Sequence, residues 1–136
     1  MIKRVIFLLV IGVSVMLGKI KSVDEKELQD LISKGTVVID IRRVDEFNAY
    51  GIIEGSKTIT FFDERGGYDP QAWLKELEKY VTNKEQTFVI YCAHANRTKI
   101  IADFLEQQVG YKNVYELTGG INYGWLDKGM KTVKYK

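Results

Sequence analysis

The chain has 136 residues, a length that suits one domain and is too short for two domains of ordinary size. Hydrophobic residues make up 46% and charged residues 28%, a composition typical of globular proteins that argues against intrinsic disorder. The formal net charge is only +2, and no stretch of the sequence gathers the basic residues that nucleic-acid binding requires. We therefore expect no nucleic-acid partner.

Residues 1–18 have the composition of an export signal. Lys3 and Arg4 are followed by an apolar run from Val5 to Gly18, which ends at Lys19. Such a run has the length of a signal peptide and is shorter than the ~20 residues that span a bilayer comfortably. We expect an exported protein, periplasmic if its source is bacterial. Because the cleavage signal is weak, an uncleaved anchor facing outside the cytoplasm stays open, and only that case implies a membrane contact.

Alternating helix and strand patterns fill residues 20–132, which we expect to form the domain. Ser22 and Glu25 have the spacing of a capping box and predict a first helix that stops near Gly35. The β-branched run 36–41 predicts a strand buried on both faces. The elements expected next are a short helix at 45–50, a strand at 57–62, a loop at 63–69 and a helix from Pro70 to Tyr80.

The second half of the chain continues the alternation. It predicts a strand at 88–91, a helix from near Arg97 to near Gly110, a strand at 114–117 and a terminal helix holding Trp125 and Leu126. Strands that alternate with helices in this way indicate an α/β domain. We expect a parallel central sheet with helices on both faces.

Cys92 is the only cysteine, so an unpaired and reactive thiol is expected if the protein is exported. It follows the strand at 88–91 and precedes the next helix by one short loop, where reacting groups of α/β sheets gather. The helix N-terminus favours an anion there, but it supplies only ~0.3–1 kcal/mol. We therefore expect several loop amides to point at the sulfur as well. In the alternative interpretation, Cys92 is a small buried hydrophobe.

Three stretches, in the same order, resemble the rhodanese-like sulfurtransferase family. Residues 92–98, Cys-Ala-His-Ala-Asn-Arg-Thr, resemble the active-site loop, in which Cys opens a six-residue cradle. Residues 39–42 with Glu46, Phe47 and the stretch 51–56 resemble the first signature of the family, and residues 114–121 with Trp125 resemble the last. The resemblance covers approximately residues 20–130 and implies a single rhodanese-like domain.

The resemblance implies a sulfurtransferase of the thiosulfate sulfurtransferase type, with Cys92 as the nucleophile. Cys92 would take a sulfane sulfur from a donor such as thiosulfate or a persulfide, become a persulfide, and pass the sulfur to a thiol or cyanide acceptor. This chemistry needs no metal and no organic cofactor. A redox protein or a sulfur-acceptor protein is a further candidate partner.

Eight other residues make up the expected substrate site: Ala93, His94, Ala95, Asn96, Arg97, Thr98, Asp40 and Arg42. Arg97 is expected to order the loop through its planar fork of donors, and Asn96 and Thr98 to cap the following helix. His94, the only histidine, is either a source of positive charge near neutral pH or a solvated loop side chain. Asp40 and Arg42 either border the same cleft or form an ion pair that holds the strand end.

Several residues depart from the family pattern. Ala95 stands where many members have Gly, so a left-handed backbone at this position would be strained. Ala93 stands where many have Arg or Lys, which removes a positive contact to an anionic donor, and Ile52 replaces a frequent His. These departures bring thiosulfate into question as the natural donor.

Two other functions stay open at this point. The domain could be a non-catalytic sulfur carrier or binding module, for which Cys92 would serve equally well. It could also be a phosphatase or arsenate reductase, since these enzymes share a loop that runs from Cys to Arg. Their loops have five residues between Cys and Arg, whereas four separate Cys92 from Arg97. The smaller ring favours a single transferable sulfur over a tetrahedral oxyanion.

Overall fold

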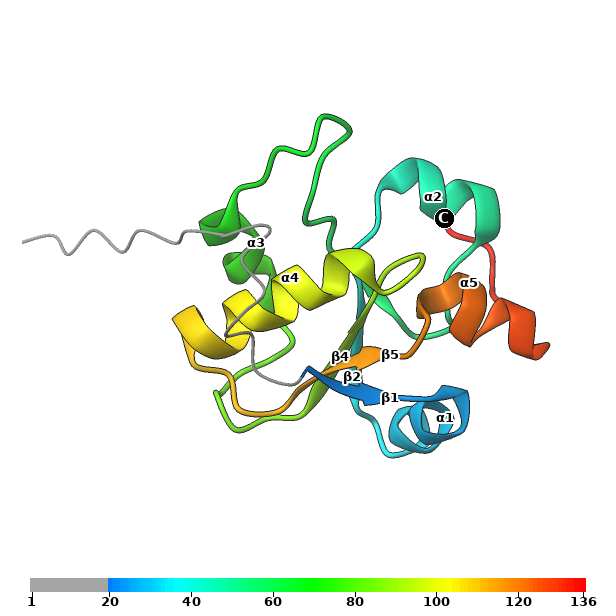
Figure 1. The fold of residues 1–136 in the computed structure, drawn as a ribbon, viewed down its shortest axis with the longest axis horizontal. Coiled ribbons are helices and arrows are strands. Elements are labelled where there is room, and N and C mark those ends of the chain that lie inside the picture. The colour runs from blue at the N-terminus through cyan, green and yellow to red at the C-terminus, as the bar shows by residue number, and fades with distance from the viewer. Residues whose placement is uncertain (1–19) are drawn as a thin grey trace, which may run out of the picture.

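The computed structural model describes residues 20–136, so the export segment expected at residues 1–18 lies outside the described residues. Five strands form one sheet in the order β1-β5-β4-β2-β3, and every pair is parallel (Figure 1). The strands are β1 (Lys21–Val23), β2 (Val37–Asp40), β3 (Lys57–Thr58), β4 (Phe88–Tyr91) and β5 (Val114–Leu117). The expected parallel sheet is confirmed.

The helices follow the strands along the chain. They are α1 (Glu25–Ser33), α2 (Val44–Tyr50), α3 (Pro70–Leu77), α4 (Asn96–Phe104) and α5 (Gly120–Gly124). A π-helical turn, Leu105–Val109, extends α4, and a 3₁₀ turn, Leu126–Lys128, follows α5. Within residues 20–136, none of the helices has the length and apolar character needed to cross a membrane.

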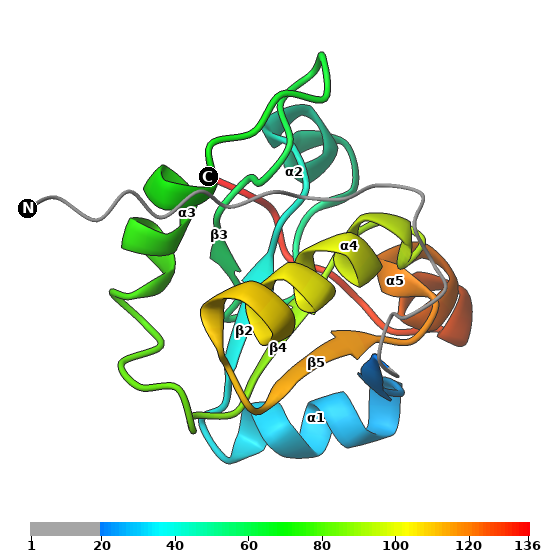
Figure 2. The same ribbon diagram turned by 60° about the vertical axis from the view of Figure 1, so that its left-hand side comes forward.

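The sheet carries a hydrophobic core on each face. Val38 and Val89 pack with Leu28 of α1 on one face, whereas the next residues along the same strands, Ile39 and Ile90, pack with α3 and α4 on the other. This alternation follows from the two-residue period of a strand. Figure 2 shows α1 on one side of the sheet and α3 and α4 on the opposite side, which confirms the expected two-sided arrangement.

The start of the domain differs from the prediction. Ser22 lies inside β1, where it pairs with Glu116, and the capping box of α1 is formed by Asp24 and Glu27 two residues later. The Asp24 carboxylate accepts from the Glu27 N–H at 2.8 Å, and the Glu27 side chain accepts from the Asp24 N–H at 3.1 Å. The predicted box of Ser22 and Glu25 is therefore wrong, because the edge strand delays the helix.

Three other elements are shorter than predicted, among them α5, which ends at Gly124 and does not include the predicted Trp125 and Leu126. Regular pairing in β3 ends at Thr58, although Ile59 and Phe61 still donate from their backbone N–H groups to the carbonyls of Asp40 and Ile41. Helix α3 ends at Leu77 instead of Tyr80. Lys79 and Tyr80 donate to the carbonyls of Glu76 and Leu77, only three positions back, and such tighter turns end an α-helix.

The first residues of α5 hold the segment that follows β4. The N–H of Ile121 donates to the carbonyl of Cys92 at 2.8 Å, and the N–H of Asn122 donates to that of Ala93 at 3.0 Å. Gly120 lies against these carbonyls with a φ of 67°, and a Cβ there would come within 2.7 Å of the Cys92 oxygen and closer still to that of Ala93. The contact therefore requires glycine.

Replacing Gly120 with Ala should destabilise the protein more than the same change at Gly35. Both glycines have a positive φ, but a Cβ at Gly35 meets nothing within 4 Å. Backbone strain alone should cost about 1–2 kcal/mol at either position, and the clash should add about 1–3 kcal/mol at Gly120. Urea denaturation of the two variants measures the difference, and equal losses of unfolding free energy would contradict the proposed close packing.

Candidate active site

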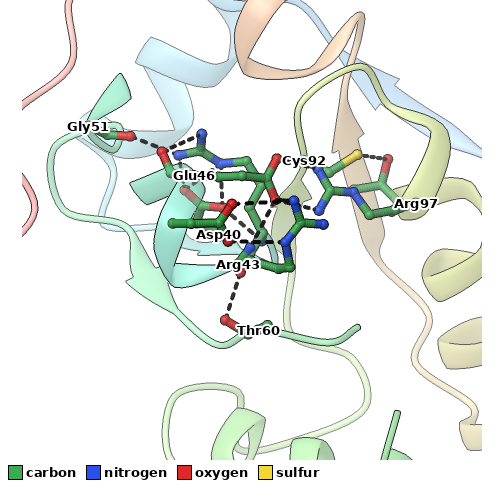
Figure 3. A network of polar contacts seen from close by, with 10 residues as sticks. Asp40, Arg43, Glu46, Gly51, Thr60, Cys92 and Arg97 are labelled. Atoms are coloured by element: carbon green, nitrogen blue, oxygen red, sulfur yellow. Dashed lines mark hydrogen bonds and ion pairs between the residues drawn. The ribbon is translucent and has the colours of Figure 1, made fainter. Parts of the chain in front are cut away.

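Cys92 lies at the carboxyl end of β4, and α4 begins at Asn96 after a loop of four residues that starts with Cys92 itself. The predicted position of the thiol between strand and helix is thus confirmed. Cys92 is only 1% exposed and belongs to the core between the sheet and helices α3 and α4. Figure 3 shows Cys92 and Arg97 in the same close-up view as Asp40 and Glu46.

The sulfur of Cys92 has a different partner from the one expected. Its S–H donates to the hydroxyl oxygen of Thr98, with 3.7 Å between Sγ and Oγ1. Within residues 20–136, the hydrogen bond that the structure gives Sγ is to this side chain, and not to one of the several backbone amides that were predicted. The reason is that the sulfur is turned into the core, where it faces the first turn of α4.

Thr98 connects the sulfur to a buried carboxylate that was not predicted. Its hydroxyl donates to Oε1 of Glu116 at 2.6 Å, and Lys99 Nζ lies 2.7 Å from Oε2 of the same carboxylate. Glu116 is 3% exposed, whereas the Lys99 side chain is 53% exposed. A glutamate within the apolar run 114–117, at the carboxyl end of a buried strand, was the available signal in the sequence.

Arg97 ties the loop to α2. Its Nη1 and Nη2 donate to the two carboxylate oxygens of Glu46 at 2.7 and 2.8 Å, which is the paired geometry that a guanidinium favours. Burial alone would raise the pKa of Glu46, but the hydrogen bonds from Arg97 and from the Arg43 N–H outweigh it and lower the pKa to about 2. The bonds to Glu46 also raise the pKa of Arg97. In the sequence, Glu46 stands out only as part of the first signature of the family.

Asp40 and Arg42 form an ion pair at the end of β2. Arg42 Nη2 lies 2.7 Å from Asp40 Oδ2, and it also donates to the carbonyl of Gly51 at 2.8 Å. Asp40 is 0% and Arg42 1% exposed, so neither side chain borders an open cleft. Of the two interpretations given above, the structure shows the ion pair that holds the strand end, next to Tyr91 in the sheet register.

The outer part of the loop is formed by residues 93–96. Ala95 has a φ of 63°, so the expected left-handed strain at this position is present. It is also the N-cap residue of α4, and no side chain caps this helix. The capping role predicted for Asn96 and Thr98 is therefore wrong, since Asn96 is the first helical residue and Thr98 bonds to Glu116 instead.

His94 is an exposed loop side chain that contacts α5. Its ring stacks at a tilt on Tyr123 with 4.7 Å between centroids, and its Nε2 lies 3.2 Å from Nδ2 of Asn122. Ala93 contributes mainly its carbonyl, which the N–H of Asn122 holds. In the part of the chain that the structure describes, no three His, Cys, Asp or Glu side chains come together to hold a metal ion.

The site as a whole presents one thiol on a loop that is fastened at three points. The α5 backbone holds the start of the loop, Glu46 holds Arg97 at its end, and Thr98 contacts the sulfur from below. A thiol in such a place can attack one sulfur atom and carry it covalently.

Comparisons with known proteins agree with this geometry. The rhodanese-like domain family matches residues 24–128. The thiosulfate sulfurtransferase GlpE of Ectopseudomonas mendocina (strain ymp) is 29% identical over 106 residues, which cover 76% of this chain and 84% of that protein. The tRNA uridine(34) hydroxylase of Pelagibacter ubique (strain HTCC1062) is 32% identical over 118 residues, which cover 84% of this chain but only 33% of that protein.

Solved structures show the same fold at lower identity. The polysulfide-sulfur transferase homodimer from Wolinella succinogenes superposes with a TM-score of 0.64 at 21% identity, covering 86% of this chain and 80% of that one. The thiosulfate sulfurtransferase from Pseudomonas aeruginosa gives a TM-score of 0.65 at 21% identity, covering 86% of this chain and 21% of that one. At these identities the likeness concerns the fold alone.

Removing the Glu46 carboxylate should change how stability depends on pH. Because the pKa of Glu46 is about 2 in the folded protein against an ordinary 4.5, its contribution is full above about pH 4.5 and is lost as the pH falls toward 2. Glu46→Gln should therefore be less stable than the parent by on the order of 2 kcal/mol at neutral pH, with the gap closing in acid.

The matched control is Glu76→Gln, because Glu76 pairs with Lys79 in an exposed ion pair. The free energy of unfolding of that variant should stay within about 1 kcal/mol of that of the parent at every pH measured. Chemical denaturation at several pH values measures both variants. A gap for Glu46→Gln that is constant from neutral pH to pH 2 would contradict the assigned role of this ion pair.

Proposed function

Because the chain belongs to the rhodanese-like domain family, we propose that it is a sulfurtransferase that carries a sulfane sulfur on Cys92. The observation that carries the proposal is the position of the only cysteine, at the start of a loop that begins at the end of β4 and closes on Arg97. The relationship to thiosulfate sulfurtransferases such as the GlpE protein supports the same reaction class.

The proposed reaction is a double displacement. The Cys92 thiolate attacks the outer sulfur of the donor, a new S–S bond forms on Sγ, and the donor's own S–S bond breaks. Thiosulfate would leave as sulfite, and a persulfide donor would leave as a thiolate. Cyanide or an acceptor thiol then attacks the outer sulfur of the enzyme persulfide, and the bond to Sγ breaks to return the Cys92 thiolate. The two steps balance without a metal, an organic cofactor or an external oxidant.

We assign the loop residues to binding and positioning. The donor would meet the outer loop formed by Ala93, His94, Ala95 and Asn96, while Arg97 positions the loop through Glu46. Thr98 contacts the sulfur directly. Asp40 and Arg42 would support the site from behind by fixing the end of β2.

The charge around the loop favours a persulfide donor over thiosulfate. Ala93 offers no positive side chain, and both Nη atoms of Arg97 are engaged by Glu46. His94, the remaining ionisable side chain of the loop, is exposed and contacts α5. A doubly charged anion would therefore find little compensation at the loop, whereas a thiol persulfide or a persulfidated protein brings less charge.

A sulfur carrier and an oxyanion enzyme are the alternatives that the test must separate. A carrier would use Cys92 in the same way but would not turn over. A phosphatase or arsenate reductase would need a wider loop than the four residues between Cys92 and Arg97 allow. Our proposal that the protein is exported rests on the apolar run at residues 5–18 and is independent of the reaction.

The test compares the parent with Cys92→Ala in steady-state assays. Thiosulfate and cysteamine persulfide, whose ammonium offsets the charge of its persulfide, serve as donors, and cyanide and a small thiol serve as acceptors. We expect turnover by the parent, faster with the persulfide, and loss of all activity above background in the variant, because the chain has no second thiol. The folded state of the variant is checked by its circular dichroism.

The same two proteins are offered an aryl phosphate. Negligible hydrolysis is expected, because the loop is too small to seat a tetrahedral oxyanion in line with the sulfur. Activity of Cys92→Ala equal to that of the parent would refute the proposal. Stoichiometric uptake of sulfur without turnover would favour the carrier, and phosphate hydrolysis as fast as sulfur transfer would assign a different reaction class.

A further inference from the structure

Thr98 lies between two groups that compete for its hydroxyl. Its Oγ1 is 3.7 Å from Cys92 Sγ and 2.6 Å from Glu116 Oε1. A threonine hydroxyl has one proton to donate and two lone pairs with which to accept. The short distance to a carboxylate is typical of a charge-assisted hydrogen bond, so the proton lies toward Glu116. Cys92 consequently faces an oxygen lone pair, to which only a protonated thiol can hydrogen-bond.

The Glu116 carboxylate is held firmly in the orientation in which it accepts the hydrogen bond from Thr98. Its strand β5 places the side chain on the α4 face of the sheet, where it is 3% exposed. Its second oxygen accepts from Lys99 Nζ at 2.7 Å, so the carboxylate is engaged on both sides by consecutive residues of α4. Buried carboxylates that are paired in this way have little freedom to turn.

We propose that Glu116 is a positioning residue that restrains the reactivity of Cys92 by keeping the Thr98 hydroxyl proton turned away from the sulfur. When the S–H bond breaks and its proton passes to water, the thiolate gains no hydrogen bond from Thr98. Thr98 could turn its proton to the sulfur only by breaking its bond to Glu116. The resting thiol is therefore held back from alkylation and oxidation, which require the thiolate.

The inference rests on the proposed role of Cys92, but it can be tested on the thiol alone. The other charged or titratable groups of the site come from several elements: Arg97 and Lys99 on α4, Glu46 on α2, Asp40 and Arg42 at the end of β2, His94 in the loop and Tyr123 on α5. All of them stay the same in the variants compared below. A difference between those variants therefore isolates Glu116 and Thr98.

The experiment measures the rate at which iodoacetamide alkylates Cys92 in the full chain as a function of pH. In Glu116→Gln, a neutral amide competes poorly with a thiolate for the Thr98 proton. The midpoint of the pH profile should therefore move down by about one pH unit, which corresponds to about tenfold faster alkylation well below the midpoint. Glu76→Gln, which removes an exposed negative charge elsewhere, should leave the midpoint unchanged.

Variants of Thr98 show whether the effect passes through its hydroxyl. In the parent background, Thr98→Val should leave the midpoint at or below its original value, because Thr98 does not donate to the sulfur there. Combined with Glu116→Gln, Thr98→Val should remove the downward shift, whereas Thr98→Ser should preserve it.

Three results would overturn the inference. The first is a midpoint for Glu116→Gln at or above that of the parent. The second is a downward shift that persists in the double variant with Val, since the removed charge would then act on the sulfur directly. The third is a raised midpoint in Thr98→Val alone, which is informative even if Glu116→Gln does not fold. Alkylation measures the reactivity of the Cys92 thiol itself. A protein without sulfur transfer would contradict the proposed function, and its alkylation profile would still test the role inferred for Glu116.

Discussion

The central strand β4 is hydrogen-bonded on both sides and covered on both faces, and this double burial determines where the chemistry can occur. Each of its four residues is buried, and it lies between β2 and β5 in the sheet. The chain can leave such a strand only at its end, among the ends of its two neighbours. Cys92 therefore emerges between the Asp40–Arg42 pair of β2 and the Glu116 carboxylate of β5. The neighbouring strands supply the polar groups, and β4 supplies the nucleophile.

Three kinds of interaction then hold the loop, and each is suited to its degree of burial. Backbone hydrogen bonds from Ile121 and Asn122 fix the start of the loop, where Gly120 allows close approach. A partly exposed ion pair, Arg97 with Glu46, fixes the end. The most buried contact is a hydrogen-bonded network beneath the sulfur, and it ends in a cation that reaches solvent, Lys99. This arrangement of the three contacts keeps fixed charge away from the outer loop, where a donor must approach.

The sequence predicted well those features that depend on local pattern. Buried runs such as 88–91 and 114–117 located the inner strands, and the junction after residue 91 located the nucleophile. Prediction failed where residues that lie far apart along the chain pair with each other. Strand β1 has three residues and exists because Lys21–Val23 pairs with β5, more than 90 positions later. Arg97 finds Glu46 from 51 positions away, and the amides expected around Cys92 are replaced by Thr98 because tertiary packing turns the sulfur inward.

The central claim, that Cys92 carries the transferred sulfur, is tested most directly by intact and peptide mass spectrometry after exposure to a sulfane donor. We expect the chain to gain the mass of one sulfur atom, on the peptide that contains Cys92, and to lose it again when cyanide is added. A chain that stays unmodified by both thiosulfate and persulfide donors, or an adduct that cyanide cannot remove, would contradict the account.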